Sequence, residues 1–198
     1  MANIWNLWNI ERTVSQRILN LIIKEEMDQI DFLKCKLGLE AFVINITKFL
    51  IVYTAALLFK VAIATSIFHA SFLLIRTFSY GKHAKTSLGC VSSSLLLFVG
   101  LPVLCQSGIL IPTYLLFYIR LLSLVVLLKF SPGVTDKNKL SKSNRKKALR
   151  VKSIVSWGVL NGLYLITASA LTENLIVLGM FFASMYVIPN KFKGVDKI

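Results

Sequence analysis

Acidic residues, histidines and cysteines are scarce in this chain. Its 198 residues include 9 Asp and Glu against 23 Lys and Arg, with two histidines and three cysteines. Three cysteines cannot all pair within one disulfide framework, and two histidines without a Cys/His cluster argue against a zinc site. There is also no Gly-rich phosphate loop that would support nucleotide-driven transport. We therefore expect neither a metal nor another cofactor.

Apolar residues, in contrast, are abundant. They make up 56% of the chain, whereas a soluble domain is usually about 45–50% apolar even when glycine is counted. The net charge of +14 raises the possibility of nucleic-acid binding. However, the charges lie between long apolar runs and accompany no RNA- or DNA-binding motif. Attraction to anionic membrane lipids explains them better, so we expect no nucleic-acid partner.

The apolar residues form runs that resemble membrane spans. A helix needs about 20 apolar residues to cross a bilayer, with a working range of roughly 17–25. The second, third and sixth runs have only 15 residues each, so they need flanking residues to span, unless one is re-entrant. We predict an all-α integral membrane protein with about six transmembrane helices. The six runs are 41–59, 61–75, 91–105, 109–128, 154–171 and 175–189.

Lysine and arginine alternate between the connectors of these runs. The segments 1–40, 76–90, 129–153 and 190–198 are basic, whereas the intervening connectors contain a single lysine, Lys60. Basic connectors stay on the cytoplasmic side. We therefore expect both termini and the connector 76–90 to be cytoplasmic. The chain start also lacks the pattern of a signal peptide.

Three parts of the chain follow from this pattern. Residues 1–40 form a cytoplasmic or interfacial segment, 41–189 the polytopic membrane domain, and 190–198 a cytoplasmic tail. Within the first part, apolar residues of 4–22 recur at near-helical spacing, together with tryptophans and arginines. This pattern is typical of an amphipathic helix lying in the membrane interface. A helix packed on the protein itself is the open alternative.

The connector RTFSYGKHAKTSLGC (76–90) contains the candidate chemistry. Cys90 follows His83 by seven residues. A thiolate forms near neutral pH with help from a histidine, positive neighbours or a helix N-terminus, and such a pair performs nucleophilic catalysis with the histidine as base and acid. An ordinary basic connector that only orients the chain is the alternative. The positive neighbours are Arg76, Lys82 and Lys85.

The spacing of the pair places a condition on this hypothesis. Seven residues along one straight helix separate two side chains by roughly 10 Å, which is too far for a hydrogen bond. The dyad therefore requires the connector to fold His83 back towards Cys90. Gly81 and Gly89 flank the histidine and the cysteine, and they provide the backbone freedom for such a fold.

The remaining histidine and the other two cysteines are weaker candidates for catalytic residues. His69 lies inside the second run without a nearby acid or cysteine, so a hydrogen-bonded core or pore histidine is expected. Cys35 lies in a charged segment and has no histidine close in sequence. Cys105 ends an apolar run and is expected to behave as a small hydrophobic residue.

Lys48 and Arg120 lie inside apolar runs, where a charge is costly unless it faces the protein interior or snorkels to the interface. We expect internal or interfacial positions, with Glu40 or Glu173 as possible partners, while binding of a substrate carboxylate is the alternative. These residues and His69 would line the pathway of a small-peptide exporter without chemistry. This exporter is the competing functional hypothesis, and a membrane scaffold without a pocket is a third.

The pattern in connector 76–90 resembles that of a known family. Arg76, the stretch Gly81-x-His83-Ala84 and the following Cys90 are similar to the accessory gene regulator protein B (AgrB) family of bacterial quorum-sensing peptidases. The likeness extends over residues 28–190. It includes the pair Leu101-Pro102 and the cluster Arg145-Lys146-Lys147.

The resemblance implies a membrane cysteine endopeptidase of the bacterial cell membrane, with its active site at the cytoplasmic face. Cys90 would attack a bond near the acidic C-terminal part of a pheromone precursor, an AgrD-like peptide with an amphipathic helix, and hold the remainder as a thioester. The precursor's own cysteine or serine would then close a thiolactone or lactone ring while His83 shuttles the proton. The resemblance also implies a homodimer. The residues expected to bind or position substrate are Arg76, Gly81, Lys82, Lys85, Glu40, Arg145, Lys146 and Lys147.

Overall fold

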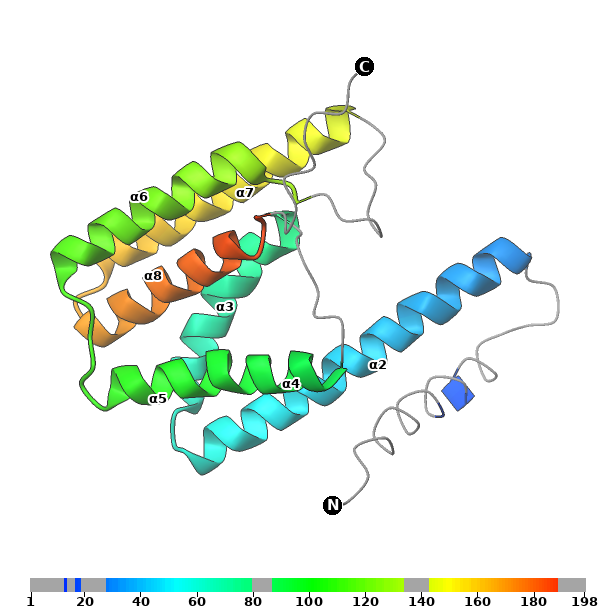
Figure 1. Cartoon of the computed structure of the whole chain (residues 1–198), viewed down its shortest axis with the longest axis horizontal. Coiled ribbons are helices and arrows are strands. Elements are labelled where there is room, and N and C mark those ends of the chain that lie inside the picture. The colour runs from blue at the N-terminus through cyan, green and yellow to red at the C-terminus, as the bar shows by residue number, and fades with distance from the viewer. Residues whose placement is uncertain (1–12, 14–16, 19–27, 80–86, 134–142, 189–198) are drawn as a thin grey trace.

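The structure is a computed structural model that describes residues 13, 17–18, 28–79, 87–133 and 143–188 (Figure 1). Within these ranges the chain is helical and contains no strand, which confirms the predicted all-α class. The amphipathic helix expected over 4–22 lies outside the described residues, except for helical Thr13, Arg17 and Ile18.

The described helices coincide with the apolar runs. The segments α4, η1 and α5 follow one another without a break and form one helical rod, in which η1 is a π-helix. Each of the six runs overlaps one helix or this rod. The helices are α2 (Gln29–Leu58), α3 (Ala62–Ser79), α4 (Ser87–Leu95), η1 (Leu96–Gly100), α5 (Leu101–Gln106), α6 (Thr113–Phe130), α7 (Ser143–Ile166) and α8 (Ala170–Met185).

Three of the described helices, α2, α3 and α6, are long and apolar enough to cross a membrane. Val91–Gln106 and Ala170–Met185 are also apolar but shorter. Membrane association is therefore supported, while six complete crossings stay a prediction. Two helices begin before their apolar runs. Helix α2 begins at Gln29, ahead of run 41–59, and α7 begins at Ser143, ahead of run 154–171.

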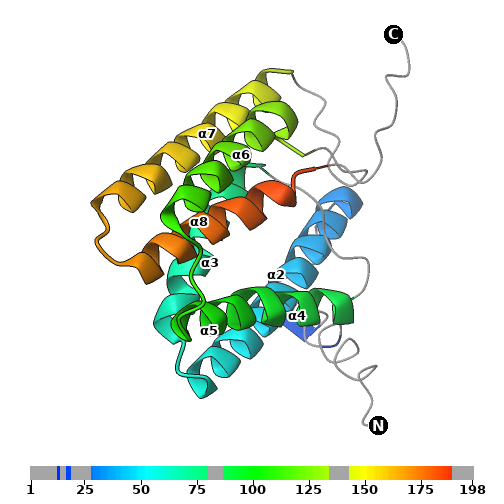
Figure 2. The same cartoon turned by 60° about the vertical axis from the view of Figure 1, so that its left-hand side comes forward.

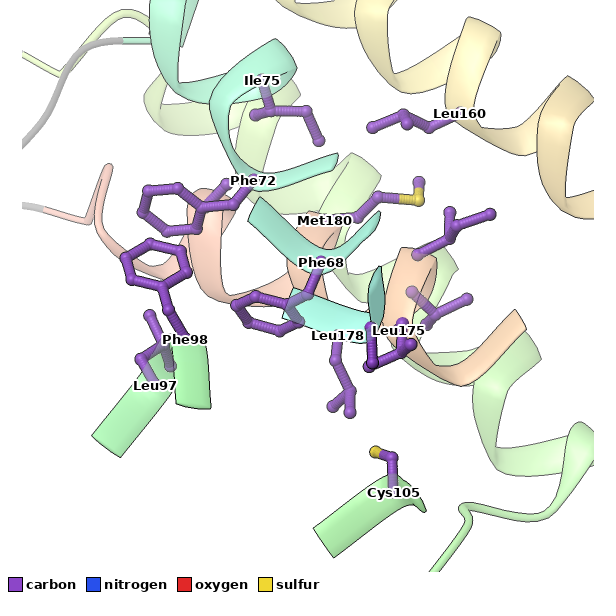
Figure 3. Close-up of a cluster of buried hydrophobic side chains, with 14 of the residues drawn as sticks. Phe68, Phe72, Ile75, Leu97, Phe98, Cys105, Leu160, Leu175, Leu178 and Met180 are labelled. Carbon is purple, nitrogen blue, oxygen red and sulfur yellow. The ribbon is translucent and has the colours of Figure 1, made fainter. Parts of the chain in front are cut away.

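Helix α8 lies at the centre of the assembly and contacts α3, α6 and α7 (Figures 1 and 2). It approaches α3 closely because Gly179 has no side chain. A Cβ atom added at Gly179 would lie 2.8 Å from the Phe68 carbonyl oxygen and 2.8 Å from the Ser71 Cβ. Small residues allow this kind of close contact between membrane helices. Around it lies a buried apolar cluster that includes Phe68, Ile75, Leu175 and Met180 (Figure 3).

The helical rod α4–η1–α5 is joined to α3 where its regular hydrogen bonding is interrupted. Pro102 has no N–H, so the Phe98 carbonyl lacks its usual i+4 donor. The buried Thr65 hydroxyl of α3 donates to this carbonyl at 2.8 Å. The Phe98 ring also packs edge-on against Phe72, with centroids 5.2 Å apart. The local break in the rod thus becomes a contact with α3.

Several contacts define one end of the assembly, here called the basic end. The Gly133 N–H, just after α6, donates to the carbonyl of Ser79, the last residue of α3, at 2.8 Å. The Tyr186 ring, just after α8, packs edge-on against Phe72 near the end of α3. The Arg150 Nε of α7 donates to the Ser131 carbonyl, just after α6, at 2.7 Å. The ends of α3, α6 and α8 and the N-terminal part of α7 therefore lie together.

The remaining connectors lie at the opposite end. The Gln106 side chain donates to the Lys60 carbonyl at 3.4 Å, and the Ile111 N–H donates to the Asn174 side-chain oxygen at 2.8 Å. These contacts join the turn after α2, the end of α5 and the starts of α6 and α8. The ends of α3, α6 and α8, which lead into basic segments, thus lie at one end of the assembly, and the short connectors lie at the other. Which end faces the cytoplasm stays a prediction from charge.

The close packing at Gly179 leads to a stability prediction. Gly179→Ala should destabilise the protein by about 1–3 kcal/mol, because the new methyl group overlaps the α3 backbone. Thermal unfolding in detergent measures this change. Gly162→Ala on α7 is the matched control, since its Cβ would meet nothing within 4 Å. An equal or higher midpoint for Gly179→Ala would contradict the described approach of α3 and α8.

Candidate active site

Cys90 lies in the first turn of α4, which begins at Ser87. Cys90 therefore lies near a helix N-terminus, one of the features that favour a thiolate. The side chain of Cys90 lies outside the described residues. So do four other predicted site residues, and the pairing of the cysteine with the histidine therefore stays a prediction. These four are Gly81, Lys82, His83 and Lys85.

Arg76 lies in the last turn of α3, at the basic end. Its side chain is half-buried, and its guanidinium carbon lies 5.5 Å from the centroid of the Tyr186 ring. Such a distance is within the range of a cation–π interaction, about 6 Å. The predicted site residue Arg76 is therefore in contact with the residue that follows α8. Tyr186 was not identified from the sequence, because nothing in its local pattern connects it with Arg76.

The other predicted substrate residues lie on two different helices. Arg145, Lys146 and Lys147 are exposed in the first turns of α7, at the basic end. Glu40 is half-buried on α2. The structure brings the α7 cluster and Arg76 to the same end of the assembly. Glu40 therefore lies on a different helix from Arg76 and from the α7 cluster.

His69 lies within the helix contacts of α3. Its Nδ1 atom lies 3.4 Å from the Tyr53 hydroxyl oxygen of α2, and its ring centroid is 4.4 Å from that of Phe98. This arrangement agrees with the expectation of a hydrogen-bonded core histidine. Cys105 is buried and Cys35 half-buried, and neither forms a disulfide. In the described part of the chain, no three His, Cys, Asp or Glu residues come together to hold a metal.

Arg120 faces α7 from the middle of α6. Its Nη1 donates to the Asn161 side-chain oxygen at 3.2 Å, and its guanidinium carbon lies 3.9 Å from the Tyr164 ring centroid. The internal position was expected, but these partners replace the predicted carboxylates Glu40 and Glu173. The buried Nε atom has no hydrogen-bond partner among the described residues. An asparagine inside an apolar run was the signal in the sequence that could have identified this contact.

The comparisons with known proteins agree with the resemblance found in the connector. The family described as "Accessory gene regulator B" matches residues 15–187. This chain belongs to the accessory gene regulator B family. No solved structure gives a significant match.

Relatives with the family's name match three quarters or more of this chain. The "Accessory gene regulator protein B" of Staphylococcus intermedius is 32% identical over 180 residues, covering 91% of this chain and 94% of the relative. That of Staphylococcus carnosus is 34% identical over 152 residues, covering 76% and 78%. A "Putative AgrB-like protein" of Listeria monocytogenes is 30% identical over 185 residues, covering 91% and 89%. The resemblance is therefore confirmed along the chain.

The Arg120 contact gives a second stability prediction. Asn161→Leu should destabilise the protein by about 1–3 kcal/mol, because it removes the side-chain acceptor of a half-buried guanidinium. The double variant Arg120→Leu/Asn161→Leu should recover most of this loss, since no charge is then left in the apolar contact. Thermal midpoints of both variants and of Arg120→Leu alone measure the coupling. If the decreases in thermal midpoint of the two single variants simply add in the double variant, the Arg120–Asn161 contact does not exist.

Proposed function

We propose that this protein is a membrane-embedded cysteine endopeptidase that releases and cyclises a quorum-sensing peptide. The observation that carries this proposal is the family match over 15–187, together with the Arg76, Gly81, His83 and Cys90 pattern of the connector. The substrate would be an AgrD-like precursor with an amphipathic helix and an acidic C-terminal part. Its C-terminal part would be removed and the remainder would become a thiolactone or lactone.

The first chemical step is an acyl transfer to sulfur. The Cys90 thiolate attacks the carbonyl carbon of the scissile peptide bond, and a C–S bond forms. The C–N bond then breaks, and the leaving amine takes a proton from the His83 imidazolium. The product is a thioester between Cys90 and the N-terminal part of the precursor. No oxidant, metal or nucleotide is needed for this balance.

The second step closes the ring. The precursor's internal thiol or hydroxyl gives its proton to His83 and attacks the thioester carbonyl. A new C–S or C–O bond forms as the bond to Cys90 breaks, and the Cys90 thiolate is regenerated. With an internal cysteine, one thioester is exchanged for another.

The helix position of Cys90 supports its role as the nucleophile. The first turn of a helix carries partial positive charge from unpaired N–H groups, which stabilises a nearby anion. Cys90 is the fourth residue of α4, counted from Ser87. Neither of the other cysteines is in the first turn of a helix that follows a histidine-bearing connector.

The basic end supports the proposed location and substrate. Positive charge favours the cytoplasmic side, so the active site would face the cytoplasm and the protein would be a multi-pass protein of the bacterial cell membrane. The exposed cluster on α7 would attract an acidic precursor tail, as well as anionic lipids. A homodimer is part of this proposal. A small-peptide exporter stays the alternative, although His69 and Arg120 are engaged in contacts between helices.

Substitution of the dyad tests the proposed chemistry directly. Cys90→Ala and His83→Ala should each abolish cleavage of a co-expressed precursor, because one removes the nucleophile and the other its proton carrier. Mass spectrometry of the wild-type protein should show a precursor fragment on Cys90, and hydroxylamine should release it. Cys35→Ser and Cys105→Ala are the thiol controls and should cleave normally. Cleavage by Cys90→Ala at wild-type protein levels would exclude the mechanism.

The charge of the α7 cluster leads to a separate prediction. Replacing Arg145, Lys146 and Lys147 with glutamine should raise KM for the precursor on the order of tenfold at low salt, because the long-range attraction between the cluster and the acidic tail is lost. The value of kcat should change much less. A precursor whose tail carboxylates are replaced by amides should have the same KM with the wild-type protein and with the triple variant. A triple variant with unchanged KM for the acidic precursor would show that the cluster serves another purpose.

A further inference from the structure

The last turn of α3 is held by groups from elsewhere in the chain. Ser79 ends this helix, and its side chain is fully buried. The last carbonyls of a helix have no partner within the helix itself, and that of Ser79 accepts a hydrogen bond from the Gly133 N–H at 2.8 Å. This bond fixes the end of α3 to the connection that follows α6.

That connection is in turn fixed to α7. The Ser131 and Ser153 hydroxyl oxygens lie 2.8 Å apart, and both side chains are fully buried. The Ser153 hydroxyl donates to the Arg150 carbonyl at 2.8 Å, so the Ser131 hydroxyl is the donor of the bond between the two serines. The Arg150 Nε donates to the Ser131 carbonyl at 2.7 Å. Each hydroxyl proton therefore has an acceptor.

A second contact holds the same turn from α8. Tyr186 places its ring 5.5 Å from the guanidinium carbon of Arg76 and packs its edge against Phe72, one turn earlier. An arginine side chain loses about 2 kcal/mol of rotamer entropy when it is fixed. The ring compensates for part of this cost by giving the cation a preferred position.

Hydrogen bonds between buried groups specify direction as well as proximity. An apolar contact between α3 and α7 would hold the two helices together without setting the rotation of the last turn of α3. We propose that Ser153, Arg150 and Tyr186 are positioning residues that keep the Arg76 guanidinium in one place at the basic end for cleavage of the precursor. This inference rests on the proposed peptidase function.

The sharpest test is a double-mutant cycle between Ser153 and Arg76. Ser153→Ala leaves the buried Ser131 hydroxyl without its acceptor. It should lower kcat/KM for precursor cleavage on the order of tenfold at a temperature where the variant is fully folded. In the Arg76→Lys background, Ser153→Ala should have little further effect on kcat/KM, because lysine has no planar guanidinium to be positioned. Purified protein in lipid nanodiscs and synthetic precursor are suitable for both measurements.

Ser156→Ala is the matched control for Ser153→Ala. Ser156 is also buried on α7, one turn further on, but its hydroxyl donates to the Lys152 carbonyl of its own helix, at 3.0 Å. Its replacement should leave kcat/KM unchanged. A variant at Tyr186 provides an independent test: Tyr186→Leu removes the ring that lies beside the Arg76 guanidinium and should resemble Ser153→Ala.

The outcomes separate this inference from the proposed function. If Ser153→Ala lowers kcat/KM equally in both backgrounds, or leaves it unchanged in folded protein, the buried junction only stabilises the fold and the inference is wrong. Normal cleavage by Tyr186→Leu would also overturn it. If the wild-type protein does not cleave the precursor, or if Cys90→Ala does, the peptidase proposal itself fails.

Discussion

The close contact between α3 and α8 at Gly179 determines how the other helices are arranged. A side chain at this position would meet the α3 backbone, so the two helix axes approach only because glycine is present. Helix α8 also contacts α6 and α7, and α3 carries Phe68 and Phe72 against the Phe98 ring. The α3–α8 pair therefore joins the α6–α7 hairpin on one side to the helical rod that contains Cys90 on the other (Figure 2).

This arrangement explains why the candidate residues gather at helix ends. Since α3 and α8 both end at the basic end, Arg76 meets Tyr186 there, and α7 begins there with its exposed basic cluster. Cys90 belongs to the rod that Phe98 and Thr65 attach to α3, roughly two helical turns before that attachment. The protein thus positions charged and polar residues at one end by packing apolar helices in its middle.

The sequence predicted the order of the helices but not their limits or their cross-contacts. Apolar runs reveal only the apolar part of a helix. Helices α2 and α7 extend further, through polar residues, and begin at Gln29 and Ser143. The contact between the rod and α3 at the π segment could not be inferred. The Phe98 carbonyl, which lacks its usual donor because of Pro102, is bonded by Thr65, a residue distant in sequence. Asn161 was missed as a partner of Arg120 because it lies on another helix, although an asparagine inside an apolar run was a usable signal. The connector pattern predicted the family and the candidate dyad, because both predictions depend only on residues close together in sequence.

The ring closure proposed above would place a positional demand on the candidate site. A thioester exposed to water is hydrolysed, so the precursor's own nucleophile would have to reach the acyl carbon first. Holding the two reacting groups together raises their effective concentration by several orders of magnitude, provided that the surrounding side chains keep one geometry. Buried hydroxyls such as Ser131 and Ser153 hold the basic end through directional bonds. A rigid, hydrogen-bonded end would therefore suit the proposed peptidase, which has to pass its acyl group to the peptide itself and not to water.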